Sequence, residues 1–272
     1  MPHPFNVDLT ADGHVHTRLC GHADGAMKDY VEASLRAGLR KITFLEHLEV
    51  NIDNRRKSWL STDDFAEYFR RGRRLQKEYR GRIDIRLGVE AGYNPQAIES
   101  LQQSLARYPW DTIGLSYHFY SLAGLHYNMA GRNRDHIAAL KAQGRTRVAE
   151  DYFKGLIQAL ENISCDTICH LDAVMRHDPT FTFTGSHLLL IDTLLESMQA
   201  KGVALEINTA GFTIRDHPHP CPQITQKAIL LSIPLVVGSD AHHPTQVGRF
   251  FDQLPNWFQS LRLRSESLLP TA

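Results

Sequence analysis

The chain has 272 residues, of which 42% are hydrophobic, and its thirty basic and thirty acidic side chains cancel. This length suits one large domain, and we expect residues 1–272 to form a single domain. The zero net charge gives no sign of a nucleic-acid partner, and no apolar run is long enough to span a membrane. The N-terminus lacks the pattern of a secretion signal and the four cysteines form no CxxC pair, so we expect a cytoplasmic protein.

Short β-rich runs alternate with longer helical patterns along the chain. We expect strands at 13–16, 41–46, 83–90, 112–117, 167–170, 203–208 and 235–237. Helices are expected between them, at 26–37, 62–79, 95–108, 146–162, 186–201, 222–231 and 245–254. Each crossover returns the next strand in the same direction, so this order predicts a parallel sheet. Seven such units favour a closed, distorted (β/α)7 barrel, with a doubly wound open sheet as the alternative.

Two long stretches without a clear pattern, 119–134 and 171–185, follow the fourth and fifth strands. In β/α barrels the segments that follow the strands form the catalytic face. We therefore expect these two stretches to shape a substrate pocket.

Side chains of the metal-ligand type recur where the predicted strands end. His14 and His16 are one residue apart in a strand, so both imidazoles project to the same face. Asp240 and His242 repeat this spacing after the last strand, which lies beside the first in a closed barrel. A lone histidine at a strand end is usually structural, but the whole set predicts one shared metal site. Its candidate ligands are His14, His16, His22, His47, Glu90, His118, His170, Asp240 and His242.

Nine ligands exceed what one four- to six-coordinate ion needs, so we expect two or three divalent ions. Imidazole and carboxylate ligands suit Zn, Fe or Mn. Glu90 can bridge two of the ions, and Asp12 shares the face of His14 and can orient a ligand histidine from behind. The remaining histidines, such as His136 and His219, receive no such support.

These residues resemble the polymerase-and-histidinol-phosphatase (PHP) superfamily. The matching motifs are DxHxH at 12–16, the pair Glu46-His47, GxE at 88–90, His118, His170 and SDAH at 239–242. The resemblance implies a distorted (β/α)7 barrel with up to three metals. It implies a first ion held by His14, His16, Glu90 and Asp240, a second by Glu90, His118 and His170, and a third by His22, His47 and His242.

Within the superfamily the chain is most similar to histidinol-phosphatases of the HisK type. The matching elements are the ExNTAG segment at 206–211, Arg215 after it, the Leu-Cys-Gly-His segment at 19–22 and Arg176. The segment after Arg215 reads Asp-His-Pro-His-Pro-Cys-Pro, where those enzymes usually carry a Tyr-Pro-Ser-Pro version. The resemblance implies hydrolysis of L-histidinol phosphate to L-histidinol and phosphate, a step of histidine biosynthesis.

A site with several cations indicates phosphate-ester hydrolysis by a hydroxide that bridges the metals, since one ion can lower the pKa of water from ~15.7 toward ~7. Arg176 and Arg215 are predicted to contact the phosphoryl group through forked hydrogen bonds. Asp240 or His242 is predicted to handle the proton of the leaving alcohol. No Ser or Cys nucleophile motif occurs, which favours direct attack over covalent catalysis.

Glu206 and Asn208 alternate with apolar residues in the sixth predicted strand, so they share its polar face. We expect them to hold the polar end of a small phosphate ester. A buried structural network is an equal alternative for Glu206.

Three other functions remain open. The first is another PHP-type phosphoesterase, acting on a sugar phosphate, a nucleotide phosphate or a nucleic acid; the zero net charge weakens the last of these. The second is an amidohydrolase-like hydrolase, which usually has eight strands and a lysine on strand four, where this chain has His118. The third is a regulatory metal-binding domain, which would need a degraded ligand set.

Overall fold

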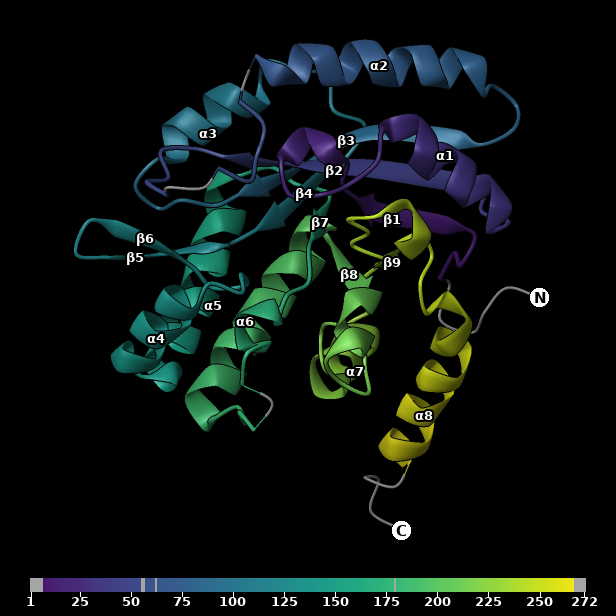
Figure 1. Ribbon diagram of the computed structural model, residues 1–272. Coiled ribbons are helices and arrows are strands. Elements are labelled where there is room, and N and C mark those ends of the chain that lie inside the picture. The colour runs from purple at the N-terminus through teal and green to yellow at the C-terminus, as the bar shows by residue number, and fades with distance from the viewer. Residues whose placement is uncertain (1–6, 55–56, 62, 179, 267–272) are drawn as a thin grey trace.

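The computed structural model describes residues 7–54, 57–61, 63–178 and 180–266, with side chains up to Leu261. Seven parallel strands form one sheet in the order β1-β2-β3-β4-β7-β8-β9. They are β1 (Ala11–Val15), β2 (Lys41–Glu49), β3 (Asp84–Gly92), β4 (Ile113–Ser116), β7 (Thr167–Ile168), β8 (Ala204–Asn208) and β9 (Leu235–Gly238). A parallel bridge between Val15 and Ala241 brings β1 beside the end of β9 and nearly closes the sheet. The distorted (β/α)7 barrel is confirmed, and the open-sheet alternative is wrong (Figure 1).

Helices surround the barrel (Figure 1). They are α1 (Met27–Arg36), α2 (Asp64–Glu78), α3 (Ile98–Leu105), α4 (Arg134–Gln143), α5 (Arg145–Asn162), α6 (Gly185–Lys201), α7 (Pro222–Leu230) and α8 (Leu254–Glu266). Their apolar faces follow the helical period: in α5, Val148, Tyr152 and Leu156 recur every four residues and are all buried. In the part of the chain that the structure describes, no helix is long and apolar enough to cross a membrane.

The register of the central strands positions the site. Parallel pairing of β2 with β3 sets His47 beside Glu90 at the carboxyl ends of the two strands. The strands are buried on both faces, as parallel strands under helices are. Gly88 lies in the middle of this packing, where an added Cβ would come 2.5 Å from the Thr112 carbonyl oxygen and 2.6 Å from Leu45. A side chain at this position would push β3 away from its neighbours and displace Glu90 two residues later.

The segment between β4 and α5 contains elements that the sequence did not predict. The stretch 119–134 holds an antiparallel hairpin, β5 (Phe119–Leu122) and β6 (Leu125–Asn128), which extends away from the barrel in Figure 1. Its two-residue turn, Ala123-Gly124, has positive φ at both positions, the conformation that matches strand twist in a hairpin. The helix α4 that follows was also not expected.

The predicted helix at 245–254 is wrong. Short 3-10 turns, η4 (Pro244–Gln246) and η5 (Phe251–Gln253), occupy that stretch, and α8 begins only at Leu254. Gly248 and Phe250 both have positive φ, which interrupts a right-handed helix. The other predicted helices are present with shifted ends, except that Thr62, the predicted start of the second helix, lies outside the described residues.

Helix α6 begins with a side-chain cap that offers a stability test. The Thr184 hydroxyl accepts a hydrogen bond from the backbone N–H of His187, and the His187 ring accepts one from the Thr184 backbone N–H. We expect Thr184→Ala to lower the free energy of unfolding by about 1 kcal/mol because the helix loses this cap. Urea unfolding measures the change. Thr193→Ala, on the exposed middle of the same helix, is the control, and equal loss in both variants would contradict the cap.

Candidate metal centre

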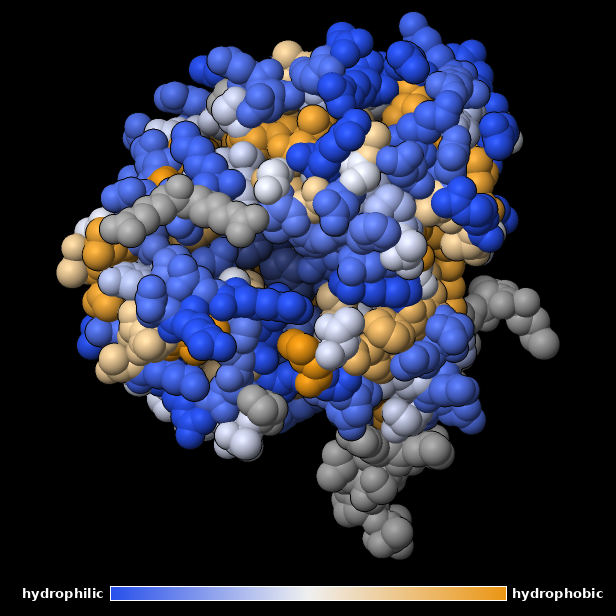
Figure 2. Space-filling view, in the orientation of Figure 1, coloured by the Kyte–Doolittle hydropathy of each residue, from blue (hydrophilic) through white to orange (hydrophobic). Residues whose placement is uncertain are grey.

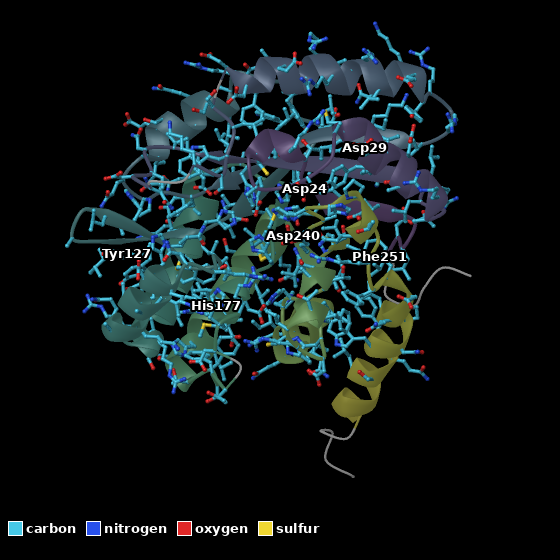
Figure 3. The ribbon with its side chains drawn as sticks, viewed as in Figure 1. Asp24, Asp29, Tyr127, His177, Asp240 and Phe251 are labelled. Atoms are coloured by element: carbon cyan, nitrogen blue, oxygen red, sulfur yellow. The ribbon has the colours of Figure 1, made fainter. Side chains whose placement is uncertain are left out.

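A polar cavity of about 940 Å³ opens at the carboxyl ends of the barrel strands. Figure 2 shows it as a hydrophilic hollow in the middle of the visible face. The volume suits a small-molecule ligand. Seven residues that the sequence singled out line it: His22, His47, His118, His170, Arg176, Asp240 and His242. Asp240, which lines the cavity, is labelled near the middle of the view in Figure 3.

The first and last strands supply one group of close donor atoms. The Nε2 atoms of His14 and His16 are 2.8 Å apart. The Asp240 Oδ1 atom lies 3.3 Å from His16 Nε2 and 3.9 Å from His14 Nε2. These three ligand atoms lie within 4.8 Å of one another, as one ion requires. The first and last strands lie side by side, as the closed barrel predicts, and this brings His14 and His16 next to Asp240 of the second i, i+2 pair.

Glu90, at the end of β3, lies at the centre of the cluster. Its Oε1 is 2.8 Å from His170 Nε2 and 3.1 Å from His118 Nε2. Its Oε2 is 2.8 Å from His47 Nδ1 and 3.5 Å from the Nε2 atoms of both His14 and His16. Burial alone would raise the pKa of Glu90, but the surrounding imidazoles, led by His118, hold it well below its usual range. A carboxylate that stays ionised among five histidines is suited to bridge cations.

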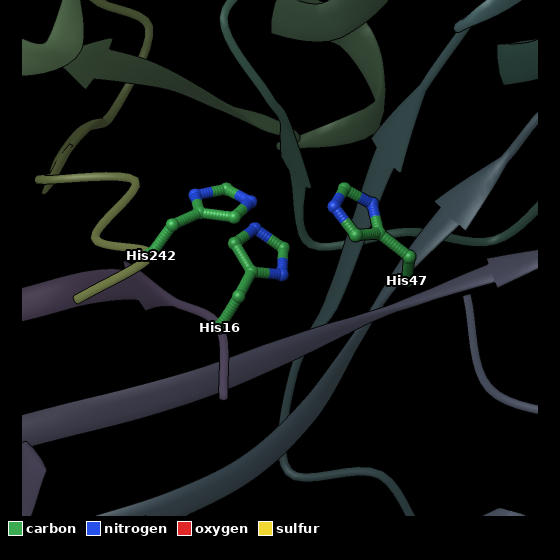
Figure 4. Close-up of side chains that lie close together, drawn as sticks. All are labelled: His16, His47 and His242. Atoms are coloured by element: carbon green, nitrogen blue, oxygen red, sulfur yellow. The ribbon is translucent and has the colours of Figure 1, made fainter. Parts of the chain in front are cut away.

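The remaining candidate ligands gather beside the cavity. The rings of His16, His47 and His242 face one another in Figure 4, and their ligand atoms form another close group. His22 Nε2 lies 2.9 Å from His242 Nε2. His47 also forms a close group with Glu90 and His118. The division that the resemblance implies, with His47 in the third set only, is therefore not reproduced in detail: His47 lies between two sets.

The donor atoms of the cluster are arranged as ligands of divalent cations and do not all satisfy one another through hydrogen bonds. Two imidazole nitrogens 2.8 Å apart share at most one proton, and this contact occurs between His14 and His16 inside the protein. The buried Glu90 Oε2 lies near imidazole nitrogens, His47 Nδ1 at 2.8 Å among them, but it accepts no hydrogen bond of normal geometry from the described residues. Unsatisfied buried lone pairs are costly unless a partner such as a metal ion meets them. The set is nitrogen- and carboxylate-based, which matches the ligand preference of Zn, Fe and Mn.

Hydrogen bonds behind the imidazoles aim their Nε2 lone pairs at the cluster. His14 Nδ1 is 2.7 Å from Glu206 Oε1, and His118 Nδ1 is 2.7 Å from Glu49 Oε1. Such partners fix the tautomer of a metal-binding histidine and strengthen it as a ligand. Sequence reasoning missed Glu49, although it lies two residues after His47 in β2 and therefore projects to the same face.

Glu206 and Asn208 are placed behind the site instead of in the cavity wall. Besides contacting His14, Glu206 accepts hydrogen bonds from the His170 backbone N–H at 2.7 Å and from Asn208 Nδ2 at 3.1 Å. Asn208 Oδ1 accepts one from the Ala210 backbone N–H. Neither residue lines the described cavity. The predicted substrate contact of Glu206 and Asn208 is therefore not seen. Glu206 belongs instead to a buried network, the alternative given above, which holds His14 and His170 in position.

The two predicted arginines have different positions. Arg176 lines the cavity and donates from Nη1 to the Ala130 carbonyl at 3.1 Å, and burial lowers its pKa while Asp240 acts in the opposite direction. Arg215 does not line the cavity and donates from Nη2 to the Met175 carbonyl at 2.6 Å. It thereby braces the segment that carries Arg176, which corrects the expectation of a direct phosphoryl contact. Arg249, which sequence reasoning missed, also lines the cavity.

Asp12 orients the backbone and not a histidine ring, which corrects the sequence expectation. Its buried carboxylate accepts hydrogen bonds from the backbone N–H groups of His14 at 3.3 Å, Ser239 at 2.9 Å and Gly248 at 2.9 Å. These bonds tie β1 to the segments that follow β9. Asp12 therefore holds the segment with His14 and His16 close to the segment with Asp240 and His242 through backbone hydrogen bonds.

Glu46, beside His47 in β2, offers a test by pH. Burial raises its pKa from 4.5 to about 8, although the Thr17 hydroxyl and backbone N–H donate hydrogen bonds that lower it. Because the pKa of this carboxyl is higher in the folded than in the unfolded protein, its protonated form favours folding. This contribution to stability is fully present at pH values below the unfolded-state pKa of 4.5 and is lost as the pH rises through the folded-state pKa of about 8.

We therefore expect Glu46→Gln, which cannot ionise, to gain stability relative to the natural protein as pH rises from about 6 to about 8, by up to about 1.4 kcal/mol per pH unit. Urea unfolding of both proteins without metal measures the difference. A difference that does not vary with pH would contradict the assignment.

A parallel barrel with imidazole and carboxylate donors at its mouth defines a candidate metal-dependent hydrolase. The family model of the PHP domain matches residues 12–210, and the chain belongs to this family. A relative from Deinococcus radiodurans, named Probable histidinol-phosphatase, is 30% identical over 248 residues, which cover 89% of this chain and 90% of the relative. The Histidinol-phosphatase of Bacillus subtilis is 26% identical over 258 residues, 89% of this chain and 96% of the relative.

A solved structure is similar over nearly the whole chain. It is a histidinol phosphate phosphatase (HISK) from Lactococcus lactis, crystallised with zinc, L-histidinol and phosphate, and its TM-score is 0.73. The match covers 92% of this chain and 93% of that chain at 18% identity. At this identity the likeness shows the barrel fold alone.

Proposed function

We propose that this protein is a metal-dependent histidinol-phosphatase that hydrolyses L-histidinol phosphate to L-histidinol and phosphate. The observation that carries the proposal is the convergence of nine imidazole and carboxylate side chains, Glu90 among them, beside a cavity that Arg176 lines. Family membership and the names of the curated relatives support the choice of reaction. The cytoplasmic location and the single domain over residues 1–272 remain predictions from the sequence.

We propose two or three divalent ions of the Zn, Fe or Mn class as cofactors, held by the nine predicted ligands. Bound ions would polarise the phosphoryl oxygens and lower the pKa of a water molecule. The protein's own contribution is positional: Glu206 and Glu49 hold the His14 and His118 rings, and Glu90 keeps a negative charge between the donor groups.

Arg176 is the proposed phosphoryl-binding residue. Its side chain lines the cavity, is partly buried and lies close enough to Asp240 for the negative charge of Asp240 to raise the pKa of the guanidinium. A charged, planar donor in this position matches the oxygens of a phosphate ester. Asp240 and His242 were the sequence candidates for the leaving-group proton, but a side chain that binds a cation is deprotonated and cannot supply one.

The test is phosphate release from a substrate panel. Protein loaded separately with Zn, Fe and Mn is assayed with histidinol phosphate, a sugar phosphate, a nucleotide and a hydantoin. We expect histidinol phosphate to be preferred by kcat/KM, and we expect chelation to abolish the activity. Preference for another ester would favour a different PHP phosphoesterase, hydantoin cleavage an amidohydrolase, and no turnover with metal bound would contradict the proposal.

A further inference from the structure

A histidine that the sequence left unassigned, His219, lines the same cavity as Arg176. It lies between β8 and α7 and is nearly buried, with 3% of its surface exposed. Its backbone pairs with that of Asn208 in both directions, N–H to carbonyl at 2.9 Å and carbonyl to N–H at 2.7 Å. The residue is therefore attached to the end of a barrel strand, which gives its ring a fixed position.

A buried carboxylate holds the His219 ring. Nδ1 of His219 lies 2.5 Å from Asp172 Oδ1, and the other oxygen of Asp172 accepts a hydrogen bond from the Cys221 backbone N–H at 2.8 Å. Asp172 is 3% exposed and does not line the cavity. A carboxylate at Nδ1 fixes the tautomer in which this nitrogen carries a proton and leaves Nε2 as the reactive atom.

The other ring nitrogen of His219, Nε2, is available to the cavity that this residue lines. No residue in the described ranges forms a hydrogen bond with His219 Nε2, and this atom is not among the fully enclosed polar atoms that lack a partner. An Asp–His pair with its outer nitrogen open to a binding cavity is the arrangement that moves protons in hydrolases. A structural histidine would satisfy both ring nitrogens with protein groups, as His187 does with Thr184 and the Thr146 carbonyl.

The position of His219 suits the leaving group of the ester. In an in-line displacement at phosphorus, the attacking oxygen and the leaving oxygen lie on opposite sides. One wall of the cavity is the imidazole and carboxylate cluster, where water would be activated. The segments after β7 and β8 also line the cavity, with Arg176, Thr213 and His219. A phosphoryl group between the cluster and Arg176 can therefore turn its leaving oxygen toward His219.

We propose that His219, positioned by Asp172, is the general acid that protonates the departing alcohol; this inference rests on the proposed phosphatase function. The P–O bond to the alcohol breaks, its electron pair stays on the alcohol oxygen, and that oxygen takes the proton from Nε2. Water provides the oxygen of the new bond to phosphorus and loses one proton, and solvent returns one proton to Nε2. His219 is the catalytic residue in this step, and Asp172 is a positioning residue.

The experiment compares two leaving groups. Histidinol phosphate releases an alkoxide that needs a proton, whereas p-nitrophenyl phosphate releases a phenolate that is stable without one. We expect His219→Gln to lower kcat for histidinol phosphate by about 100-fold or more, the usual contribution of general acid catalysis, and to change kcat for p-nitrophenyl phosphate by less than about threefold. Bound metal, measured by elemental analysis, stays at the natural level.

Two further variants complete the test. Asp172→Asn, which keeps the shape of the pair, should show the same selective loss, and it carries the test if His219→Gln does not fold. His217→Gln is the matched control, because His217 belongs to the same segment but does not line the cavity. Equal loss on both substrates, or no loss on either, would overturn the role of His219. Inactivity of the natural protein on both esters would instead contradict the phosphatase function itself.

Discussion

Replacing Glu90 with glutamine is expected to lower phosphate release by well over 100-fold and to reduce the metal content. The two carboxylate oxygens contact imidazole nitrogens of His47, His118 and His170 at 2.8 to 3.1 Å, so the amide removes the charge at the centre of the cluster. Changes to outer partners of metal ligands already cost about 10- to 100-fold in affinity or activity, and loss of a central candidate ligand should cost more. Elemental analysis and a phosphate-release assay measure both effects.

The control for this prediction is Glu99→Gln, an exposed carboxylate in the first turn of α3. It should leave activity and metal content unchanged. A Glu90→Gln protein with full metal content and normal turnover would show that the cluster is not the reacting centre.

Replacing Arg176 with alanine is expected to lower kcat/KM by about 100-fold, which corresponds to about 2.7 kcal/mol, within the range for removing one partner of a buried charge pair. Metal content should not change, because Arg176 contacts the Ala130 carbonyl and none of the predicted ligands through a hydrogen bond in the described structure. This separates substrate binding from metal binding. Arg176→Lys should recover only part of the loss, since an ammonium group lacks the fork of two parallel donors.

The matched control is Arg86→Ala, an exposed arginine on β3 that pairs with Asp84 away from the cavity. Steady-state kinetics and metal analysis of the three proteins decide the outcome. Normal kcat/KM in Arg176→Ala would show that another cation, such as the cavity-lining Arg249, binds the phosphoryl group.

The sequence was sufficient for the barrel and for the gathering of the nine candidate ligands at one rim, because both follow from simple periods and from strand order. A strand alternates its side chains, so His14 and His16 had to share a face, and so did Glu206 and Asn208. Parallel order places all carboxyl ends at one rim, which brought His118 of the fourth unit to Glu90 of the third. Once the β-rich runs had located the strands, both inferences needed only the order of the strands and the residues at which they end.

What the sequence could not provide depends on tertiary contacts. The alternation of side chains along β8 shows that Glu206 faces inward. Only the folded structure shows that the Glu206 carboxylate is already occupied by the His14 ring and is therefore not open to a substrate. His219 lies in a Pro-rich loop without a period, and its significance comes from Asp172, forty-seven residues earlier in the chain. The hairpin turn at Ala123-Gly124 and the positive φ of Phe250 were hidden for a related reason: a residue other than glycine adopts such backbone only where its surroundings impose it.

The place where β1 meets β9 is held by little direct strand pairing, essentially the Val15–Ala241 bridge and one hydrogen bond from the His16 backbone to Ala241 at 2.9 Å. Yet His16 comes from one side of this seam and Asp240 from the other. An ion bound between them would fasten the two ends of the barrel, so cation binding would be thermodynamically linked to closure of the fold. We therefore expect a change that loosens this seam to weaken metal affinity, even one far from the reacting atoms, and we expect the metal-free protein to open first between β1 and β9.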